Sequence, residues 1–124
     1  MFVKKIVTYD AFSQEADIIV SDSIYDVLCY CHPVDNNILG AEVKEIVSLF
    51  ATEIVRSDTN EYFIYKDVQP YSYYVCGQVI DLIKPRISIG QIIIILDHPL
   101  PKDIKKGEYV ELKVDRFDCN LKRR

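Results

Sequence analysis

The side chains best suited to chemistry in this sequence lie at residues 29–32, where the order is Cys-Tyr-Cys-His. Thiolates and imidazoles are ligands of Zn²⁺, and a structural zinc site takes four of them. In a β-strand Cys29 and Cys31 point to one face, whereas His32 points to the other. The chain has no second pair of cysteines at such close spacing. We therefore expect neither a metal nor another cofactor, and interpret Cys29 and Cys31 as buried thiols.

A cysteine nucleophile would need a histidine base beside it, and the chain offers His32 and His98. Each histidine precedes a proline in a segment predicted to be a loop, which is typical of a solvated residue. The sequence contains no G-x-S-x-G, no phosphate-binding glycine loop and no H-E-x-x-H. We therefore expect that the protein is not an enzyme.

Six aromatic side chains lie between residues 62 and 74, in a chain with 9 Tyr and 5 Phe. On two neighbouring strands such side chains form a platform for a protein partner or for stacked bases. The alternative is that alternate members face the core and the others cover the sheet. The predicted partner-binding residues are the tyrosines of this cluster: Tyr62, Tyr65, Tyr71, Tyr73 and Tyr74.

The charged residues around these tyrosines favour a protein partner over a nucleic acid. They are Arg56, Asp58, Glu61, Lys66 and Asp67, with a net charge of −1. A nucleic-acid groove needs a surplus of positive charge, because its affinity comes from the release of counterions by Lys and Arg. Nucleic-acid binding through this cluster is therefore disfavoured.

Charge is spread unevenly along the chain. Residues 1–83 hold 5 basic and 13 acidic residues, a net charge of −8, whereas residues 84–124 hold 10 and 6, a net charge of +4. Lys102, Lys105 and Lys106 are candidates for a basic patch. The terminal basic residues would extend the patch if they fold nearby: Lys122, Arg123 and Arg124. The alternative is a solvated turn and a frayed tail.

Composition predicts the fold class that must position these residues. The chain has 124 residues, of which 49% are hydrophobic, and it contains 17 Ile and 13 Val but 4 Ala. Branched and aromatic side chains pack well on a pleated surface and lose rotamer freedom in a helix. A chain of this length can bury a sufficient core without disulfides or a structural metal. We expect one mainly β domain over residues 1–124.

Turn residues divide the chain into expected strands. Ser21, Asp22 and Ser23 separate two β-rich runs and predict a hairpin. Gly77 predicts a bulge or a barrel corner inside a long strand. Residues 41–57 fit both helical spacing and alternation, and we rank a long bent strand slightly ahead of a helix. The other expected strands are residues 2–9, 16–20, 24–31, 61–66, 71–83, 87–96 and 108–117.

These segments suggest a Greek-key or OB-like barrel or sandwich of about seven strands. Cys31-His32-Pro33 followed by Gly40 resembles Asp97-His98-Pro99 followed by Gly107, so a loose β-β-loop-β duplication over 16–57 and 72–118 is conceivable. The alternative is generic turn chemistry, because loops with proline that end in glycine are common before strands.

The expected function follows from this acidic, motif-poor surface. We expect a non-enzymatic protein-interaction module of the immunity, inhibitor or assembly-subunit type, and the alternative is a single-stranded nucleic-acid-binding protein of OB-like fold. The longest apolar run is Ile92–Leu96, and the first residues lack the pattern of a signal peptide. We therefore expect no membrane association, a cytoplasmic location and four reduced cysteines.

Overall fold

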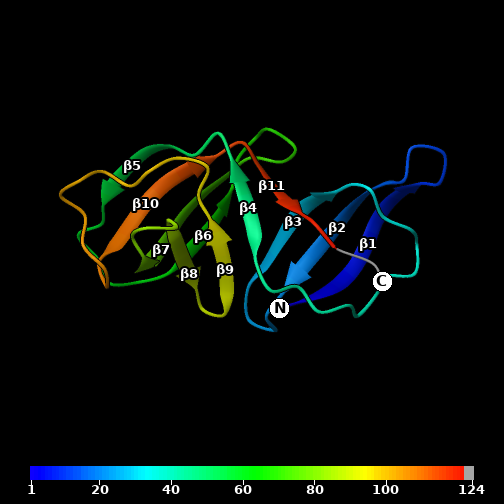
Figure 1. Cartoon of the computed structure of the whole chain (residues 1–124), viewed down its shortest axis with the longest axis horizontal. Helices are drawn as coiled ribbons and strands as arrows, with labels where there is room; N and C mark the ends of the chain where they lie inside the picture. Colours follow the sequence, from blue (N-terminus) through cyan, green and yellow to red (C-terminus); the bar gives the residue numbers. More distant parts are fainter. Residues whose placement is uncertain (122–124) are drawn as a thin grey trace.

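Eleven β-strands and no helix make up residues 1–121, the part of the chain that the computed structural model describes (Figure 1). The strands are β1 Phe2–Asp10, β2 Glu15–Ser21, β3 Asp26–Cys31, β4 Ile46–Leu49, β5 Thr52–Arg56, β6 Phe63–Lys66, β7 Tyr73–Asp81, β8 Arg86–Ile89, β9 Ile92–Ile95, β10 Tyr109–Val114 and β11 Arg116–Cys119. The mainly β prediction is confirmed, and the number of strands is larger than the expected seven or so.

All eleven strands belong to one mixed sheet in the order β1-β2-β3-β11-β4-β9-β8-β7-β10-β5, with β6 paired to β7 beside this path. The pairs β3–β11 and β4–β9 are parallel, and the others are antiparallel. The path ends at β1 on one side and at β5 on the other, so the sheet is open in residues 1–121. The barrel form of the prediction is therefore not confirmed.

Along the long axis of the molecule, the strands form two groups. Figure 1 shows β1, β2 and β3 at one end, and β5, β10, β7 and β6 toward the other, with β11 and β4 between them. The last strand, β11, lies between β3 and β4, so the chain returns late to its first hairpins. β11 thereby connects β1, β2 and β3 to the rest of the sheet.

Residues 41–57 form two short strands, so the helix alternative is wrong and the long bent strand is divided. The break lies at Phe50, which has a φ of 57°, and Ala51. The Asp97 carboxylate accepts hydrogen bonds from the backbone N–H groups of both residues, at 2.8 and 3.2 Å. Asp97 therefore fixes the point where the chain leaves β4 and starts β5.

Two other segments that we expected to be single strands are also divided. Residues 87–96 form the β8–β9 hairpin, because Gly90 takes a φ of 59° in the turn. Residues 108–117 contain β10 and the start of β11, with the break at Asp115. The first of these turns is marked in the sequence by Gly90 and the polar Gln91, because glycine supplies the positive φ that the turn requires.

Gly77 lies where β7 changes partners. Its register with β10 is regular, opposite Val110, so there is no bulge between these strands. On the other edge of β7, the partner changes from β6, opposite Cys76, to β8, opposite Gln78. A Cβ atom at Gly77 would lie 2.8 Å from the carbonyl oxygen of Ser88. The glycine therefore permits a close approach of two backbones at this change of partner.

The core is formed by branched side chains of both groups of strands together with Phe117, which is fully buried.

In the part of the chain that the structure describes, there is no helix of the length and apolarity needed to cross a membrane.

Candidate functional site

The five predicted tyrosines do not form one surface. Tyr73 is 7% exposed, its hydroxyl accepts a hydrogen bond from the backbone N–H of Leu28 at 2.9 Å, and its ring packs 5.7 Å from that of Phe117. Tyr62 packs against the rings of Tyr25 and Tyr109. Tyr73 is thus a core residue, and Tyr62 belongs to a separate aromatic group.

Two of the predicted tyrosines, Tyr65 and Tyr74, do share an exposed surface, and the ring of Phe63 stacks with both. The ring centroids of Phe63 and Tyr65 are 4.6 Å apart, and those of Phe63 and Tyr74 are 6.2 Å apart with parallel planes. Tyr65 is 63% exposed and Tyr74 is 36% exposed. These three residues of β6 and β7 are called the aromatic strip below.

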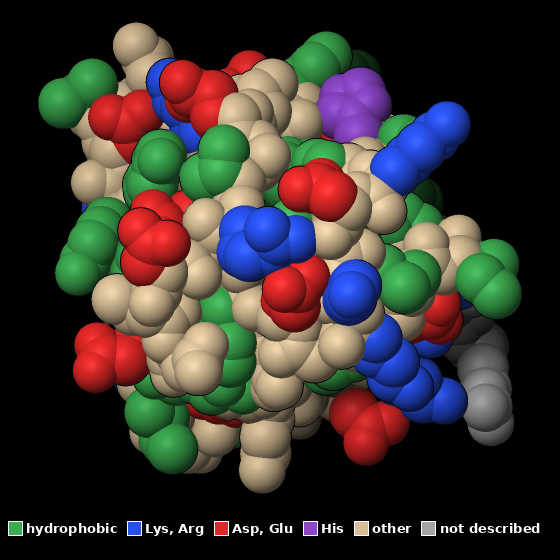
Figure 2. Space-filling view, turned by 90° about the vertical axis from the view of Figure 1, so that its left-hand side faces the viewer, with side chains coloured by type: hydrophobic (Ala, Val, Ile, Leu, Met, Phe, Trp, Pro, Cys, Tyr) green, Lys and Arg blue, Asp and Glu red, His purple; other side chains and the backbone are tan. Residues whose placement is uncertain are grey.

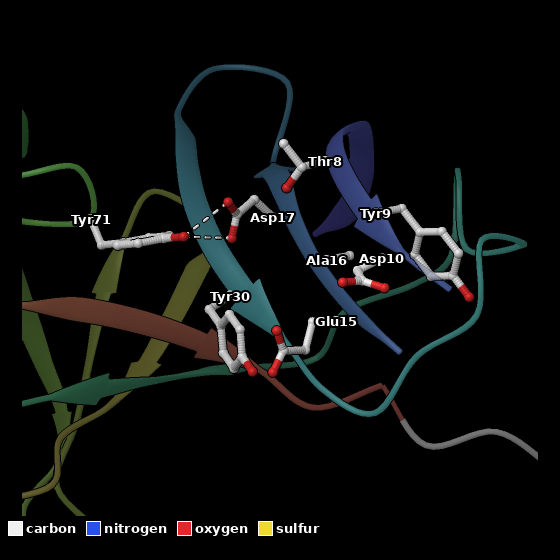
Figure 3. A pocket seen from close by; sticks show the side chains of 8 residues that line it. All are labelled: Thr8, Tyr9, Asp10, Glu15, Ala16, Asp17, Tyr30 and Tyr71. Carbon is white, nitrogen blue, oxygen red and sulfur yellow. Dashed lines mark hydrogen bonds between the residues drawn. The ribbon is translucent and has the colours of Figure 1, made fainter. Parts of the chain in front are cut away.

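Tyr71 leaves the cluster and lies against the N-terminal hairpins. Its hydroxyl donates to both carboxylate oxygens of Asp17 on β2, at 3.0 and 2.9 Å. The turn between β6 and β7, which carries Tyr71, therefore meets the face of β2. Figure 3 shows the Tyr71 ring approaching Asp17 from the side of the second group of strands.

A pocket of about 190 Å³ opens where these elements meet. Antiparallel register brings its carboxylates together, because Asp10 pairs with Glu15 and Thr8 pairs with Asp17. On the other edge of β2, Asp17 pairs with Tyr30 of β3. This site, called the acidic pocket below, is lined by Thr8, Tyr9, Asp10, Glu15, Ala16, Asp17, Tyr30 and Tyr71 (Figure 3).

The residues that line the acidic pocket carry a net negative charge. Asp10, Glu15 and Asp17 contribute three carboxylates, and none of the eight lining residues is Lys or Arg. The hydrogen bond to Asp17 raises the pKa of the Tyr71 hydroxyl, and the hydrogen bond to Glu15 raises that of Tyr30. Both phenols therefore stay protonated and donate to the carboxylates well into the alkaline range.

Arg116 on β11 lies beside the acidic pocket but is already paired. Its Nε donates to Asp118 at 2.6 Å, and its second contact with that carboxylate is 3.1 Å long. The guanidinium also lies 4.4 Å from the centroid of the Tyr30 ring. The Tyr30 ring thus holds one guanidinium of the chain itself, through the attraction between a cation and an aromatic face.

Sequence reasoning identified Tyr71 but missed Asp10, Glu15, Asp17 and Tyr30. The available signal was the register of the hairpins. With a turn between residues 10 and 15, Asp10 and Glu15 must face each other, and Asp17 then lies on the same face as Glu15. The approach of Tyr71 depends on long-range packing and had no local signal.

The three predicted basic residues lie on the loop between β9 and β10 and do not form a surface of one sign. Lys102, Lys105 and Lys106 are exposed, but Asp103 and Glu108 lie among them. Arg56 pairs with Glu108 at 2.9 Å and with Asp103 at 3.7 Å. Figure 2 shows basic and acidic side chains interspersed over this end of the molecule. The terminal residues Lys122, Arg123 and Arg124 lie outside the described residues.

Strand alternation does not separate His32 from Cys29 and Cys31, because β3 ends at Cys31 and His32 lies beyond it. Cys29 and Cys31 are buried, whereas His32 is exposed in the loop that follows β3. Residues 1–121 contain no group of three or more His, Cys, Asp or Glu that is arranged to hold a metal ion. His98 lies in the loop that follows β9, and its Nε2 is 3.9 Å from the carboxylate of Asp97.

Comparisons of the chain with protein-family models, with curated proteins and with solved structures found no match. The site itself is therefore the basis for any functional conclusion.

Proposed function

We propose that this protein is a non-enzymatic protein-interaction module whose acidic pocket takes a basic side chain of a partner protein. One observation supports the proposal above the others: Asp10, Glu15 and Asp17 face one pocket, and no Lys or Arg lines it. A guanidinium or ammonium group would gain charge-assisted hydrogen bonds there.

The tyrosines of the acidic pocket suit the same ligand. The Tyr71 hydroxyl already donates its proton to Asp17, which orients this carboxylate, and Glu15 lies beside the Tyr30 hydroxyl. A carboxylate has about four acceptor positions, so each retains acceptors for an incoming N–H group. The stacking of Arg116 on Tyr30 illustrates how well this ring accommodates a guanidinium.

The aromatic strip would supply contact area for the partner. Exposed tyrosine is a frequent component of protein interfaces, because a rigid ring buries much area at a small entropic cost. In this proposal the protein is of the immunity, inhibitor or assembly-subunit type. A cytoplasmic location belongs to the proposal and is supported by four cysteines that form no disulfide.

The nucleic-acid alternative has less support. Its two required elements, a basic surface and stacked aromatic rings, are found on different parts of the chain, and carboxylates accompany both. Asp103 and Glu108 lie among Lys102, Lys105 and Lys106, and Asp67 pairs with Lys113 at 3.6 Å close to the aromatic strip. An enzyme is disfavoured because the sequence contains no G-x-S-x-G, no phosphate-binding glycine loop and no H-E-x-x-H.

The proposal is tested by a nuclear magnetic resonance titration of the ¹⁵N-labelled protein with a short arginine-rich peptide. We expect the amide signals of Thr8, Asp17, Tyr30 and Tyr71 to shift in a saturable manner, with little change at Lys105. A glutamate-rich peptide of equal length is the control and should shift none of these signals. Saturable shifts confined to the aromatic strip, or no saturable shift with the arginine-rich peptide, would refute the proposal.

A further inference from the structure

Three of the four cysteines lie close together in the core, on the neighbouring strands β3 and β11. Cys29 and Cys31 lie on β3, and Cys119 is the last residue of β11, the parallel neighbour of β3. The exposed fractions of Cys29 and Cys31 are 0%, and that of Cys119 is 2%. Cys76 is also buried but lies on β7, in another part of the sheet.

Strand register selects one pair among these three thiols. Cys119 lies directly opposite Cys31, whereas Phe117 lies opposite Cys29. Neighbouring strands are about 4.8 Å apart, which lies inside the range of about 4.4 to 6.8 Å between the Cα atoms of a disulfide. Cys29 and Cys31 are two positions apart on one strand, a spacing of about 6.6 Å that lies near the upper limit.

The two opposed thiols differ in acidity, which gives them different roles. The neighbouring Cys119 thiol lowers the pKa of Cys31, although burial acts in the opposite direction. The neighbouring Cys31 thiol, together with burial, raises the pKa of Cys119. Cys31 is therefore the thiol that ionises first, and the thiolate is the nucleophilic form of cysteine.

We propose that Cys31 and Cys119 are a redox-modification site, which forms a reversible disulfide when the protein meets a hydroperoxide. The Cys31 sulfur attacks one peroxide oxygen, the O–O bond breaks, and the product is a sulfenic acid and one water or alcohol. The Cys119 thiol then attacks the Cys31 sulfur, the S–O bond breaks, and water leaves. The peroxide accepts two electrons and the two thiol protons. A dithiol reverses the reaction by exchange.

The disulfide would join the late strand β11 to the early strand β3. Such a bond closes a loop that contains most of the chain and so restricts the unfolded state strongly. Both sulfurs are buried, so oxidation requires that the end of β11 opens locally, as strand ends do. This inference does not depend on the proposed binding function.

The test treats the reduced, full-length protein with hydrogen peroxide, blocks free thiols with an alkylating reagent and maps the tryptic peptides by mass spectrometry. We expect residues 6–44 to be linked to residues 117–122, with loss of two hydrogen atoms and reversal by dithiothreitol. The Cys29→Ala and Cys76→Ala variants should keep this link, which assigns it to Cys31. Oxidation should also raise the midpoint of thermal unfolding of the wild type by about 5 °C or more.

The wild-type peptide map decides the matter even if a variant fails to fold. Four alkylated thiols after peroxide treatment of the folded protein would overturn the proposal. A link between Cys29 and Cys31, a link that involves Cys76, or oxidation of Cys119 to a sulfonic acid without any link would overturn it equally.

Discussion

At the scale of single residues, the carboxylates of the N-terminal hairpins serve two different purposes. Asp22 is used by the fold: its Oδ1 accepts the backbone N–H groups of Ile24 and Tyr25, and its Oδ2 accepts that of Gln91 at 2.8 Å. It thereby joins the β2–β3 turn to the β8–β9 turn. Asp17 instead meets a tyrosine hydroxyl and faces the acidic pocket. Only the second kind of carboxylate remains available to a ligand.

The role of Asp22 predicts a specific loss of stability in acid. Burial alone would raise the pKa of Asp22, but the N–H groups of Tyr25, Gln91 and Ile24 together bring it below the ordinary value of 3.8. The pKa in the folded state is therefore below that of the unfolded chain. The stabilisation is complete above about pH 4 and is lost as the pH falls through the folded-state value.

Substitution of Asp22 checks this linkage. Asp22→Asn should lower the free energy of unfolding at pH 7 by about 1 to 2 kcal/mol, because hydrogen bonds to a charged acceptor become neutral ones. Urea unfolding at pH 7 and at acidic pH measures the free energy of unfolding. The difference in this free energy between variant and wild type should become smaller in acid. Asp58→Asn, an exposed residue, is the matched control. A difference that is the same at all pH values would contradict the role assigned to the Asp22 charge.

At the scale of elements, single residues decide where a strand changes its neighbours. Gly77 is the clearest case, since β7 leaves β6 and joins β8 at this point and the Ser88 carbonyl lies within 2.8 Å of the position of a Cβ atom. The side chains of Ile87 and Ile89 lie 3.1 Å from the same position. Backbone and two core residues would all have to move to accommodate a methyl group.

We therefore expect Gly77→Ala to destabilise the fold by about 1 to 3 kcal/mol, the range of overpacked cores. Urea unfolding measures this change, with Asn36→Ala, on an exposed loop, as the control substitution. Unchanged stability of Gly77→Ala would mean that β7 and β8 do not approach each other so closely.

The elements also show which parts of the fold and site were predictable from the sequence. The β2–β3 hairpin was predictable, because Ser21, Asp22 and Ser23 interrupt two β-rich runs. The side chains of Ser21 and Asp22 accept local backbone N–H groups in this turn. The division of residues 41–57 was not, because it depends on Asp97, which is distant in the sequence. In the acidic pocket, only the pairing of Asp10 with Glu15 and the position of Asp17 were predictable, because they follow from the hairpin register. Tyr71 reaches the pocket by tertiary packing.

At the scale of the whole molecule, charge is sorted by position. Residues 1–31, which form β1, β2 and β3, contain two lysines and five acidic residues, and Lys4 is paired with Asp26 at 2.8 Å. The opposite end, with β5 and β10, carries both signs in alternation (Figure 2). In the proposed function, this distribution would steer a cationic partner toward the N-terminal strands, where the acidic pocket lies.

The same distribution predicts weak binding of nucleic acid. A labelled single-stranded oligonucleotide should bind this protein no better than about 10⁻⁴ M at moderate salt, since few Lys and Arg side chains are placed to displace counterions from its phosphates. Fluorescence anisotropy at low and moderate salt measures this affinity. Submicromolar binding with a steep salt dependence, weakened by Lys105→Glu and by Tyr65→Ala, would favour the nucleic-acid alternative.

The most direct test of the interaction function compares two triple variants in calorimetric binding of the arginine-rich peptide. One carries Asp10→Asn, Glu15→Gln and Asp17→Asn in the acidic pocket, and the other carries Glu53→Gln, Asp58→Asn and Glu61→Gln on exposed sites. Each removes three negative charges from a net charge of −4 and leaves −1. We predict affinity reduced about tenfold or more, roughly 1.4 kcal/mol, in the first variant alone. Equal affinities of the two variants would contradict the acidic pocket as the binding site.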